Sequence, residues 1–426
     1  MSSNLLILLE HPKIKPLVIF AAFFIFLNTL LFYGFVRDGT WLVIAILLIP
    51  VYRQIGLLNF LLSSLSFLFG TVVSIFILEY GFPQLTYWPP FDRLKSTDEN
   101  GLICYKPNQN ITVQLPYGQL KPWSREDEIF DLRPRVVSVK TDSMGFRNSS
   151  DYNHEEFVLA GDSMIAGAGS SQDDILSSQL KSEFGVNVYN AAVPGADILD
   201  YVKNIQKFKS LHGKSFKTIM FITELNDFVG PTLSPSSKDS VAKTKKFYKK
   251  WIRRYKKLFQ QNVFYRFQFS VYRNFTKGTV EGGENRIFID DIGTHRVAFF
   301  RPTMRENYSF PDEIVQAVRS VKDQIAYMVF IPKKFRVYFR MIKQNPYASI
   351  KNVEWLALQS LGVKLGIPTL NFTELMEEES QKLLRDKNEL MFWEDDSHWN
   401  ANGARTTAGL LCKTIQELGC ATPRVH

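Results

Sequence analysis

Ser163 is a candidate nucleophile. It ends the tripeptide Gly161-Asp162-Ser163 and closely follows the apolar run 157–160. If that run is a buried strand of a parallel sheet, Ser163 lies just past the carboxyl end of the strand, where such sheets bind ligands. A serine hydroxyl placed there could attack a carbonyl carbon once a neighbouring base removes its proton. The tripeptide alone is an ordinary turn sequence, so the assignment depends on partners elsewhere in the chain.

Two further segments carry groups that could bind an oxyanion. Residues 190–195 follow a second predicted strand, and residues 224–227 follow a third. The backbone N–H of Gly195 and the side-chain amide of Asn226 could donate to the negative oxygen that forms when a carbonyl group is attacked. Turn chemistry is the alternative in both segments, because Asn and Gly are common loop residues.

A histidine with two neighbouring carboxylates lies near the C-terminus. Asp395 and Asp396 precede His398 on a predicted loop. Either carboxylate could orient the imidazole as a general base, and the spacing does not choose between them. A metal site is the competing interpretation, since Asp and His both bind metals. The chain has only 6 His and no second cluster of this kind, so we expect no metal and no cofactor.

The elements that must position these groups alternate along the chain. Short apolar runs predict strands at 157–160, 186–189, 218–223, 328–331 and 367–370. Apolar residues at helical spacing predict helices at 174–184, 198–208, 312–326, 355–361 and 404–418, the last with Gly419 as its cap. This succession indicates an α/β fold of three layers, in which a parallel sheet is covered by helices.

Two segments depart from this alternation. Residues 81–150 contain the alternating runs 111–115 and 136–139, which predict a small β-rich cap or linker before the α/β domain of 151–426. Residues 230–310 interrupt that domain as an insertion. Within the insertion, 243–257 carries only basic charges, with aromatic residues at every fourth position. Such a helix could contact anionic lipid headgroups, and an ordinary packed helix with a solvated face is the alternative.

The N-terminal residues 1–80 are apolar enough to cross a membrane. Residues 17–36 and 57–78 are each long enough to span a bilayer as a helix. The shorter run 41–52 could span where the bilayer thins. The basic residues that flank these runs place the N-terminus in the cytoplasm. We favour three spans, which put everything after about residue 79 outside; two spans would keep the catalytic region on the side of the N-terminus.

The net charge and the cysteines give weaker indications. The formal net charge of +9 suits an anionic lipid or glycan, and no nucleic-acid-binding motif is present. A basic solvated surface without a specific partner is the alternative. Cys104, Cys412 and Cys420 lack the spacing of metal ligands. A Cys412–Cys420 bridge could form at the end of the last helix, but we favour free, partly buried thiols.

In this order, the candidate residues resemble the blocks of the SGNH (GDSL-type) hydrolase superfamily. Those blocks carry a nucleophilic Ser, an oxyanion Gly, an oxyanion Asn and an Asp-x-x-His pair, which here correspond to Ser163, Gly195, Asn226, and Asp395 with His398. The resemblance covers about 157–227 and 311–418. The run 141–147, Thr-Asp-Ser-Met-Gly-Phe-Arg, is similar to one that often precedes the first block in membrane-linked members.

The spelling Asp396-x-His398-Trp399 is similar to the alginate-type O-acetyltransferases of bacterial envelopes. This second resemblance favours Asp396 over Asp395 as the carboxylate that orients His398, and it assigns Trp399 to the substrate. It implies serine-dependent acyl transfer by an O-acyltransferase or acetylesterase that acts on a cell-surface glycan. The expected place is the bacterial inner membrane, with a periplasmic catalytic domain and a multi-span membrane protein that delivers the acyl group. The alternatives are a non-catalytic SGNH-like subunit of a membrane complex and an esterase of membrane lipid.

Overall fold

The computed structural model describes residues 95–97, 103–115, 117–120, 134–213, 216–224, 226–228, 287–301, 307–343 and 351–422. All of these residues belong to one folding unit. The predicted membrane runs of residues 1–80 and the basic segment 243–257 lie outside the described residues. Within the described ranges, no helix combines the length and the apolar character needed to span a bilayer.

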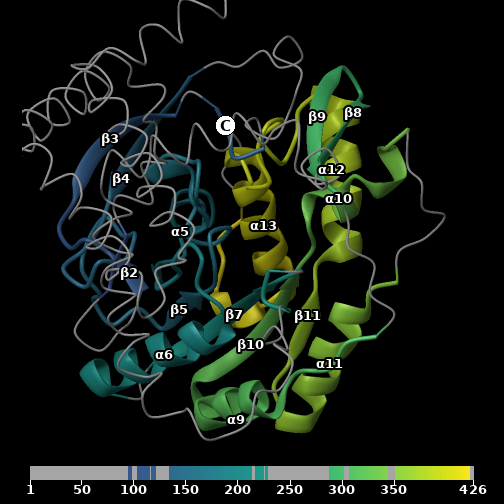
Figure 1. Ribbon diagram of the computed structural model, residues 1–426. Coiled ribbons are helices and arrows are strands. Elements are labelled where there is room, and N and C mark those ends of the chain that lie inside the picture. Colours follow the sequence, from purple (N-terminus) through teal and green to yellow (C-terminus); the bar gives the residue numbers. More distant parts are fainter. Residues whose placement is uncertain are drawn as a thin grey trace, which may run out of the picture. The chain divides into compact units, whose positions relative to one another are not determined.

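A five-stranded sheet with the strand order β11-β10-β7-β5-β6 forms the centre of this unit (Figure 1). All neighbouring strands in it are parallel. Its strands are β5 (Phe157–Ala160), β6 (Val188–Asn190), β7 (Lys217–Thr223), β10 (Ile325–Ile331) and β11 (Thr369–Asn371). The predicted α/β fold with a parallel sheet is thus confirmed. Since β5 pairs with both β6 and β7, the loops that follow these three strands emerge side by side.

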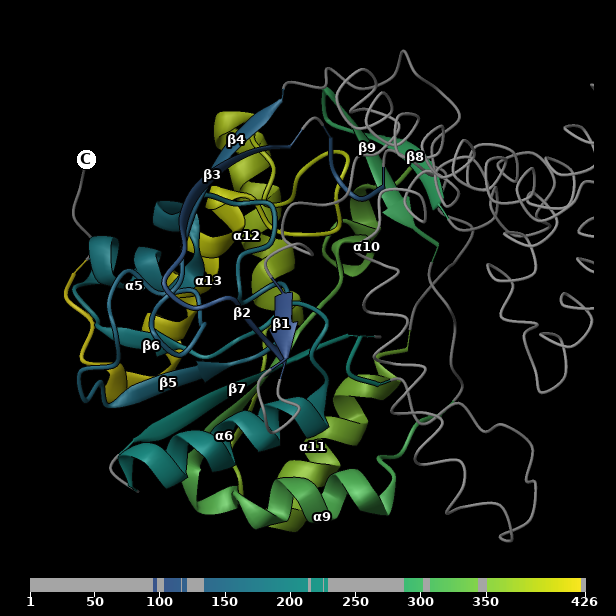
Figure 2. The ribbon, with the colours of Figure 1, turned by 60° about the vertical axis from the view of Figure 1, so that its left-hand side comes forward.

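Helices cover both faces of the sheet, as the two ribbon views show (Figures 1 and 2). One face carries α5 (Leu176–Phe184), α12 (Thr373–Lys387) and α13 (Ala401–Thr414), and the other carries α6 (Ile198–His212), α9 (Asp312–Ser320) and α11 (Val353–Leu365). Successive strand residues point to opposite faces. Leu159 and Phe221 belong to the core under the first group of helices, whereas Val158 and Met220 belong to the core under the second. These strands read as continuous apolar runs because both of their faces are buried.

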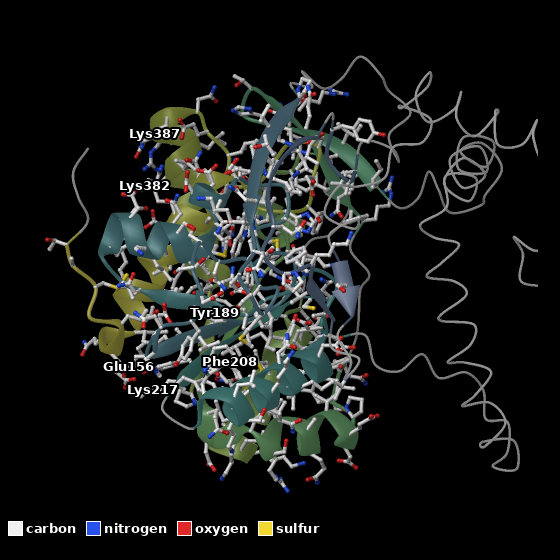
Figure 3. All side chains as sticks on the ribbon, turned by 90° about the vertical axis from the view of Figure 1, so that its left-hand side faces the viewer. Glu156, Tyr189, Phe208, Lys217, Lys382 and Lys387 are labelled. Atoms are coloured by element: carbon white, nitrogen blue, oxygen red, sulfur yellow. A yellow bond between two sulfur atoms is a disulfide. The ribbon has the colours of Figure 1, made fainter. Side chains whose placement is uncertain are left out.

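Aromatic rings fill the space between β6 and α6. The ring centroids of Tyr189 and Phe208 lie 5.0 Å apart, and both residues are buried (Figure 3). Phe146 meets Tyr189 edge to face at 6.0 Å. This packing fixes β6 against α6, and with it the direction in which the loop after β6 leaves the sheet. At the surface, Lys217 at the start of β7 pairs with Glu156 at 3.0 Å (Figure 3).

Among the described residues, three antiparallel strand pairs lie outside the sheet. They are β1 (Lys95–Thr97) with β2 (Ile103–Tyr105), β3 (Asn110–Leu115) with β4 (Arg135–Lys140), and β8 (Ile287–Ile292) with β9 (His295–Phe300). The runs 111–115 and 136–139 were predicted as strands, and they pair with each other. The hairpin β8–β9 was not predicted and lies within the stretch 230–310 that was assigned to the insertion.

Three predictions in the C-terminal half were wrong in detail. The last helix, predicted over 404–418 with Gly419 as its cap, runs over Ala401–Thr414 and is followed by Ile415 as its C-cap. The helix predicted over 312–326 ends at Ser320, and after the short 3-10 turn Lys322–Gln324 the chain enters β10. Cys412 and Cys420 were predicted to be free thiols, but they form a disulfide with their Cα atoms 5.6 Å apart. The chain turns back after α13 through a 3-10 turn that ends at Gly419, whose φ is +60°. That turn brings Cys420 beside the helix end.

Candidate active site

A tight turn after β5 presents Ser163. A Cβ atom at Gly161 would lie 2.6 Å from Cγ1 of Ile165, so the close approach requires glycine. The carboxylate of Asp162 is completely buried and accepts hydrogen bonds from the backbone N–H of Met164 at 2.9 Å and from the hydroxyl of Thr223 at 3.1 Å. The turn is therefore held from its own chain and from β7, and Ser163 remains half-buried beside it.

Arg147 holds the loop that follows Ser163. Its side chain is completely buried, and its guanidinium donates to the carbonyl oxygens of Ala166, Gly167 and Ser170 at 3.2, 2.5 and 2.6 Å. It also donates to the carbonyl of Ser138 on β4 at 3.0 Å. Burial lowers the pKa of Arg147 to about 10, so it stays charged at neutral pH. The run 141–147 thus contributes a scaffold for the nucleophile loop.

A buried polar network joins that run to the end of β6. Asp142 accepts from the side-chain amide of Asn148 at 2.8 Å and from the hydroxyl of Tyr189 at 2.5 Å. Asn148 also binds the backbone of Asn190 in both directions, at 3.0 Å each. Asn190 in turn donates its side-chain amide to the carbonyl of Ile165 at 3.1 Å. Burial raises the pKa of Asp142 despite its donors.

The loop after β6 carries Gly195 and runs alongside the nucleophile turn. The N–H of Val193 donates to the carbonyl of Gly161 at 3.1 Å, which ties the two loops together. Gly195 has φ = +76°, in the region that favours glycine, and it is exposed. Gly195, the predicted oxyanion glycine, stands two residues after Val193 in this loop and thus close to the turn that carries Ser163.

Asn226 approaches the nucleophile turn from the other side, after β7. Its side-chain amide donates to Asp162 at 2.5 Å. The following residue, Asp227, is buried and accepts from the N–H of Thr223 at 2.7 Å and from the hydroxyl of Tyr201 at 2.8 Å. Burial raises the pKa of Asp227 far above its usual range, and the nearby Asp162 carboxylate adds to the effect. These contacts fix the turn on which Asn226 stands.

His398 completes a chain of hydrogen bonds with Ser163. Its Nε2 lies 2.8 Å from Oγ of Ser163, and its Nδ1 lies 2.7 Å from Oδ1 of Asp396. Because a carboxylate only accepts, Nδ1 carries the proton and Nε2 faces the serine hydroxyl. Burial opposes the charged imidazole, but the Asp396 carboxylate and its hydrogen bond outweigh burial and raise the pKa of His398. The side chain of Asp396 is 8% exposed. Burial works against ionisation of its carboxyl group, but His398 and Arg135 hold the pKa of Asp396 below the usual value.

The two neighbouring aspartates differ in their hydrogen-bond partners. Asp396 binds His398, whereas the carboxylate of Asp395 accepts from the backbone N–H of Gly118 and faces Arg135 at 3.4 Å. Asp396, which the resemblance favoured over Asp395, is therefore the carboxylate that contacts the imidazole. Asp395 has the Asp-x-x-His spacing that is usual in the superfamily, but its carboxylate is bound by Gly118 and Arg135.

Trp399 does not occupy the position predicted for it. Its side chain is 3% exposed and belongs to the hydrophobic core, so it offers no accessible surface to a substrate. A Cβ atom at Gly403 would lie 2.9 Å from Cβ of Trp399, so the tryptophan packs directly on the first turn of α13. Asn400 caps that helix through the N–H of Gly403 at 3.2 Å. The tryptophan thus anchors the loop of His398 to the helix that follows it.

Lys334 is a further residue at this loop that sequence reasoning missed. It starts the short helix α10 (Lys334–Val337), directly after β10. Its buried ammonium nitrogen lies 2.9, 2.6, 3.0 and 3.0 Å from the carbonyl oxygens of Ala298, Trp393, Glu394 and Asp396, so its three hydrogens are shared among four acceptors. Burial lowers its pKa to about 7, against the opposing effect of the nearby carboxylates. In the sequence it lies in a basic stretch, which is typical of a solvated surface and gives no signal of burial.

The chain is similar to one family model and to several solved structures. A family model described as GDSL-like Lipase/Acylhydrolase matches residues 157–408. No curated protein matches the chain. A solved lipase/acylhydrolase from Enterococcus faecalis is similar, with 15% identity over 64% of this chain and 100% of that chain and a TM-score of 0.32. A lipolytic G-D-S-L protein from Veillonella parvula has 14% identity over 62% and 98%, with a TM-score of 0.29. A Bacillus subtilis protein has 10% identity over 75% and 85%, with a TM-score of 0.33.

The family assignment rests on the family model, because likenesses at these TM-scores carry no weight of their own. The matched region begins with β5, includes the turns of Ser163, Gly195 and Asn226, and ends in α13 beyond His398. It spans more than half of the chain. The chain therefore belongs to the GDSL-like lipase/acylhydrolase family.

Proposed function

We propose that the chain catalyses serine-dependent acyl transfer, with Ser163 as the nucleophile, His398 as the general base and Asp396 as the residue that orients the base. The observation that carries the proposal is the pair of consecutive hydrogen bonds from Ser163 through His398 to Asp396, at 2.8 and 2.7 Å. Nucleophilic serine catalysis needs an adjacent base, and the base needs a partner on its other nitrogen. Both requirements are met by side chains that are largely buried.

The reaction then follows from this geometry. Nε2 of His398 takes the proton of Ser163 while Oγ attacks the carbonyl carbon of the acyl group. The imidazolium that forms is stabilised by the Asp396 carboxylate. When the tetrahedral intermediate collapses, the imidazolium gives its proton to the leaving alkoxide, and the acyl group remains on Ser163. Water or a sugar hydroxyl then attacks this ester, and His398 again takes the proton. Attack by water makes the protein an esterase, and attack by a sugar hydroxyl makes it a transferase.

Three donors are proposed for the oxyanion. They are the backbone N–H groups of Ser163 and Gly195 and the side-chain amide of Asn226. One amide hydrogen of Asn226 is committed to Asp162, and the amide nitrogen carries two, so the second remains for the substrate. Each such donor typically contributes a factor of about 100 to 1,000 to kcat.

The proposed substrate is an O-acyl group of a cell-surface glycan, handled on the outer side of the bacterial inner membrane. The Cys412–Cys420 disulfide supports this location, because structural disulfides persist mainly in oxidising compartments. The predicted membrane spans of residues 1–80 would tether the catalytic unit there. In a transferase, a multi-span membrane protein would deliver the acyl group to Ser163 from the other side.

Labelling of the full-length chain by a fluorophosphonate probe tests the nucleophile. Wild type and Ser210→Ala, which changes an exposed serine on α6, should be labelled equally. Ser163→Ala should not react, and His398→Ala should react far more slowly. Labelling that persists in Ser163→Ala would refute the assignment. No labelling of the wild type would favour the non-catalytic alternative, in which the domain serves as a subunit of a membrane complex.

Product analysis separates the proposed substrates. Wild type is incubated with an acetylated glycan, with a phospholipid ester, and with an activated acetyl ester plus a deacetylated glycan acceptor. Transfer of the acetyl group to the acceptor identifies a transferase, and release of acetate alone identifies an esterase. Turnover of the phospholipid ester but neither glycan would contradict the glycan assignment and support a lipid esterase.

A further inference from the structure

Residues 118–120, here named the clamp segment, lie against the loop that carries His398. The N–H of Gly118 donates to the carboxylate of Asp395, and the N–H of Leu120 donates to the carbonyl of the same residue at 2.9 Å. Between them, the N–H of Gln119 donates to Oδ2 of Asp396 at 3.2 Å. Three successive backbone N–H groups thus bind the two aspartates of the catalytic loop.

Arg135, at the start of β4, approaches the same two carboxylates. Its guanidinium nitrogens lie 3.4 Å from Asp395 and 3.7 Å from Asp396, and its side chain is 11% exposed. The guanidinium also stacks over the ring of Trp393, 4.4 Å from the centroid. The stacking fixes the orientation of Arg135, so that its charge faces the aspartates.

The two oxygens of Asp396 therefore have different partners. Oδ1 accepts from Nδ1 and from the backbone N–H of His398, at 2.7 and 3.2 Å, while Oδ2 faces Gln119 and Arg135. Burial favours the protonated form of the Asp396 carboxyl group. A protonated Asp396 would no longer stabilise an imidazolium. Arg135 counters this tendency because its charge faces both groups.

The close approach of the clamp segment depends on Gly118. A Cβ atom there would lie 2.5 Å from the carbonyl oxygen of Asp395 and 2.7 Å from Cβ of Asp396. The first of these is a backbone atom that cannot rotate away. Alanine at this position would therefore push the segment off the catalytic loop, although the backbone of Gly118 itself is not in the left-handed region.

We propose that the clamp segment and Arg135 together position the Asp396–His398 pair. Both lie before residue 157, outside the region that the family model matches, so the chain would complete its catalytic site with groups from the β-rich segment that precedes the α/β domain. Asp395 is then the residue that fastens the clamp segment to the catalytic loop. The inference rests on the proposed function only for its kinetic consequences; the positioning itself is a structural claim.

The kinetic test compares Arg135→Met, Arg135→Lys and Gly118→Ala in the full-length chain with wild type. Arg385→Met is the matched control, since Arg385 forms an exposed ion pair with Asp386 near the end of α12. With an activated acetyl ester, Arg135→Met and Gly118→Ala should lose about 10- to 100-fold in kcat with little change in KM. Arg135→Lys should recover part of the loss, and the control should match wild type.

The pH profile separates positioning from a general loss of structure. The charged groups that act on His398 are Asp396, Asp162 and Arg135, and Arg135 is the one that lowers its pKa. The acid limb of kcat/KM should therefore move to higher pH in Arg135→Met. Wild-type kcat and an unchanged profile in both Arg135→Met and Gly118→Ala would overturn the proposal. So would a loss of kcat that merely follows the fraction of unfolded protein in thermal melts.

A spectroscopic readout keeps the claim testable if the chain proves inactive. In chain labelled with nitrogen-15 histidine, the Nδ1 proton of His398 that is shared with Asp396 should give a far-downfield proton resonance. The resonance should be lost in Arg135→Met and Gly118→Ala and kept in the control. An inactive wild type would refute the proposed function alone, whereas retention of the resonance in both variants would refute the clamp alone.

Discussion

Replacing each of the two neighbouring aspartates by asparagine should have very different consequences. In Asp396→Asn, the amide cannot supply the negative charge that stabilises the His398 imidazolium. At the 2.7 Å separation, an effective dielectric constant of about 20 gives an attraction of about 6 kcal/mol. That energy corresponds to a loss of roughly 10⁴-fold in kcat. In Asp395→Asn, the side chain keeps an oxygen that can accept from Gly118 and has no contact with His398, so the loss should stay below about 10-fold.

The assay is steady-state hydrolysis of an activated acetyl ester, with both variants purified as full-length chain. Thermal melts confirm that each variant is folded. Equal losses in the two variants would refute the division of roles between Asp395 and Asp396. A larger loss in Asp395→Asn would transfer the orienting role to the residue that the superfamily spacing selects.

Three further outcomes are expected. The pKa of His398 is raised and the base must be neutral to accept a proton, so kcat/KM should fall as the pH drops, with a midpoint above about 6.5, the ordinary pKa of histidine. A midpoint below about 6.5 in a profile measured from about pH 5 to 9 would contradict the pairing of His398 with Asp396. Arg147→Met leaves several buried carbonyl oxygens without a donor, so urea unfolding should show a stability loss on the order of 4 kcal/mol, and a loss under about 1 kcal/mol would exclude its scaffold role. Cys420→Ser removes the disulfide that closes a loop of 8 residues and should lower the free energy of unfolding in urea by roughly 2–3 kcal/mol. In cells, Cys412 of the wild type should react with a maleimide only after reduction, and reaction without a reductant would place the domain in a reducing compartment.

The sheet could be predicted because its signal is local. The strands β5 and β7 are short runs with both faces buried, so apolar composition alone marks them, and both predictions lie within a residue of the observed strands. The order of Ser163, Gly195, Asn226 and His398 along such strands is also visible in the sequence. Each stands after a strand or before a helix, and no long-range contact is needed to see it.

The failures share a different cause, since they depend on contacts between distant residues. Apolar residues at 314, 318, 321 and 325 continue a helical spacing, but Ile325 pairs with Thr218 in the sheet, so α9 ends early. The hairpin β8–β9 is bound to the catalytic loop through Ala298 and Glu394 at 2.9 Å, a contact between residues almost a hundred positions apart. The choice between Asp395 and Asp396 likewise depends on long-range contacts, because Gly118 and Arg135 hold Asp395 while Oδ1 of Asp396 faces His398.

The carboxylate of Asp162 has a consequence for the reorganisation energy of the reaction. It holds the N–H of Met164, the hydroxyl of Thr223 and the amide of Asn226 in fixed orientations. A dipole in water must rotate toward a new charge, and that rotation adds to the activation barrier. If Asn226 binds the oxyanion as proposed, its planar amide already points one hydrogen in a direction set by the bond to Asp162. The ordering of this donor is then completed once, when the chain folds, and is not repeated in each catalytic cycle.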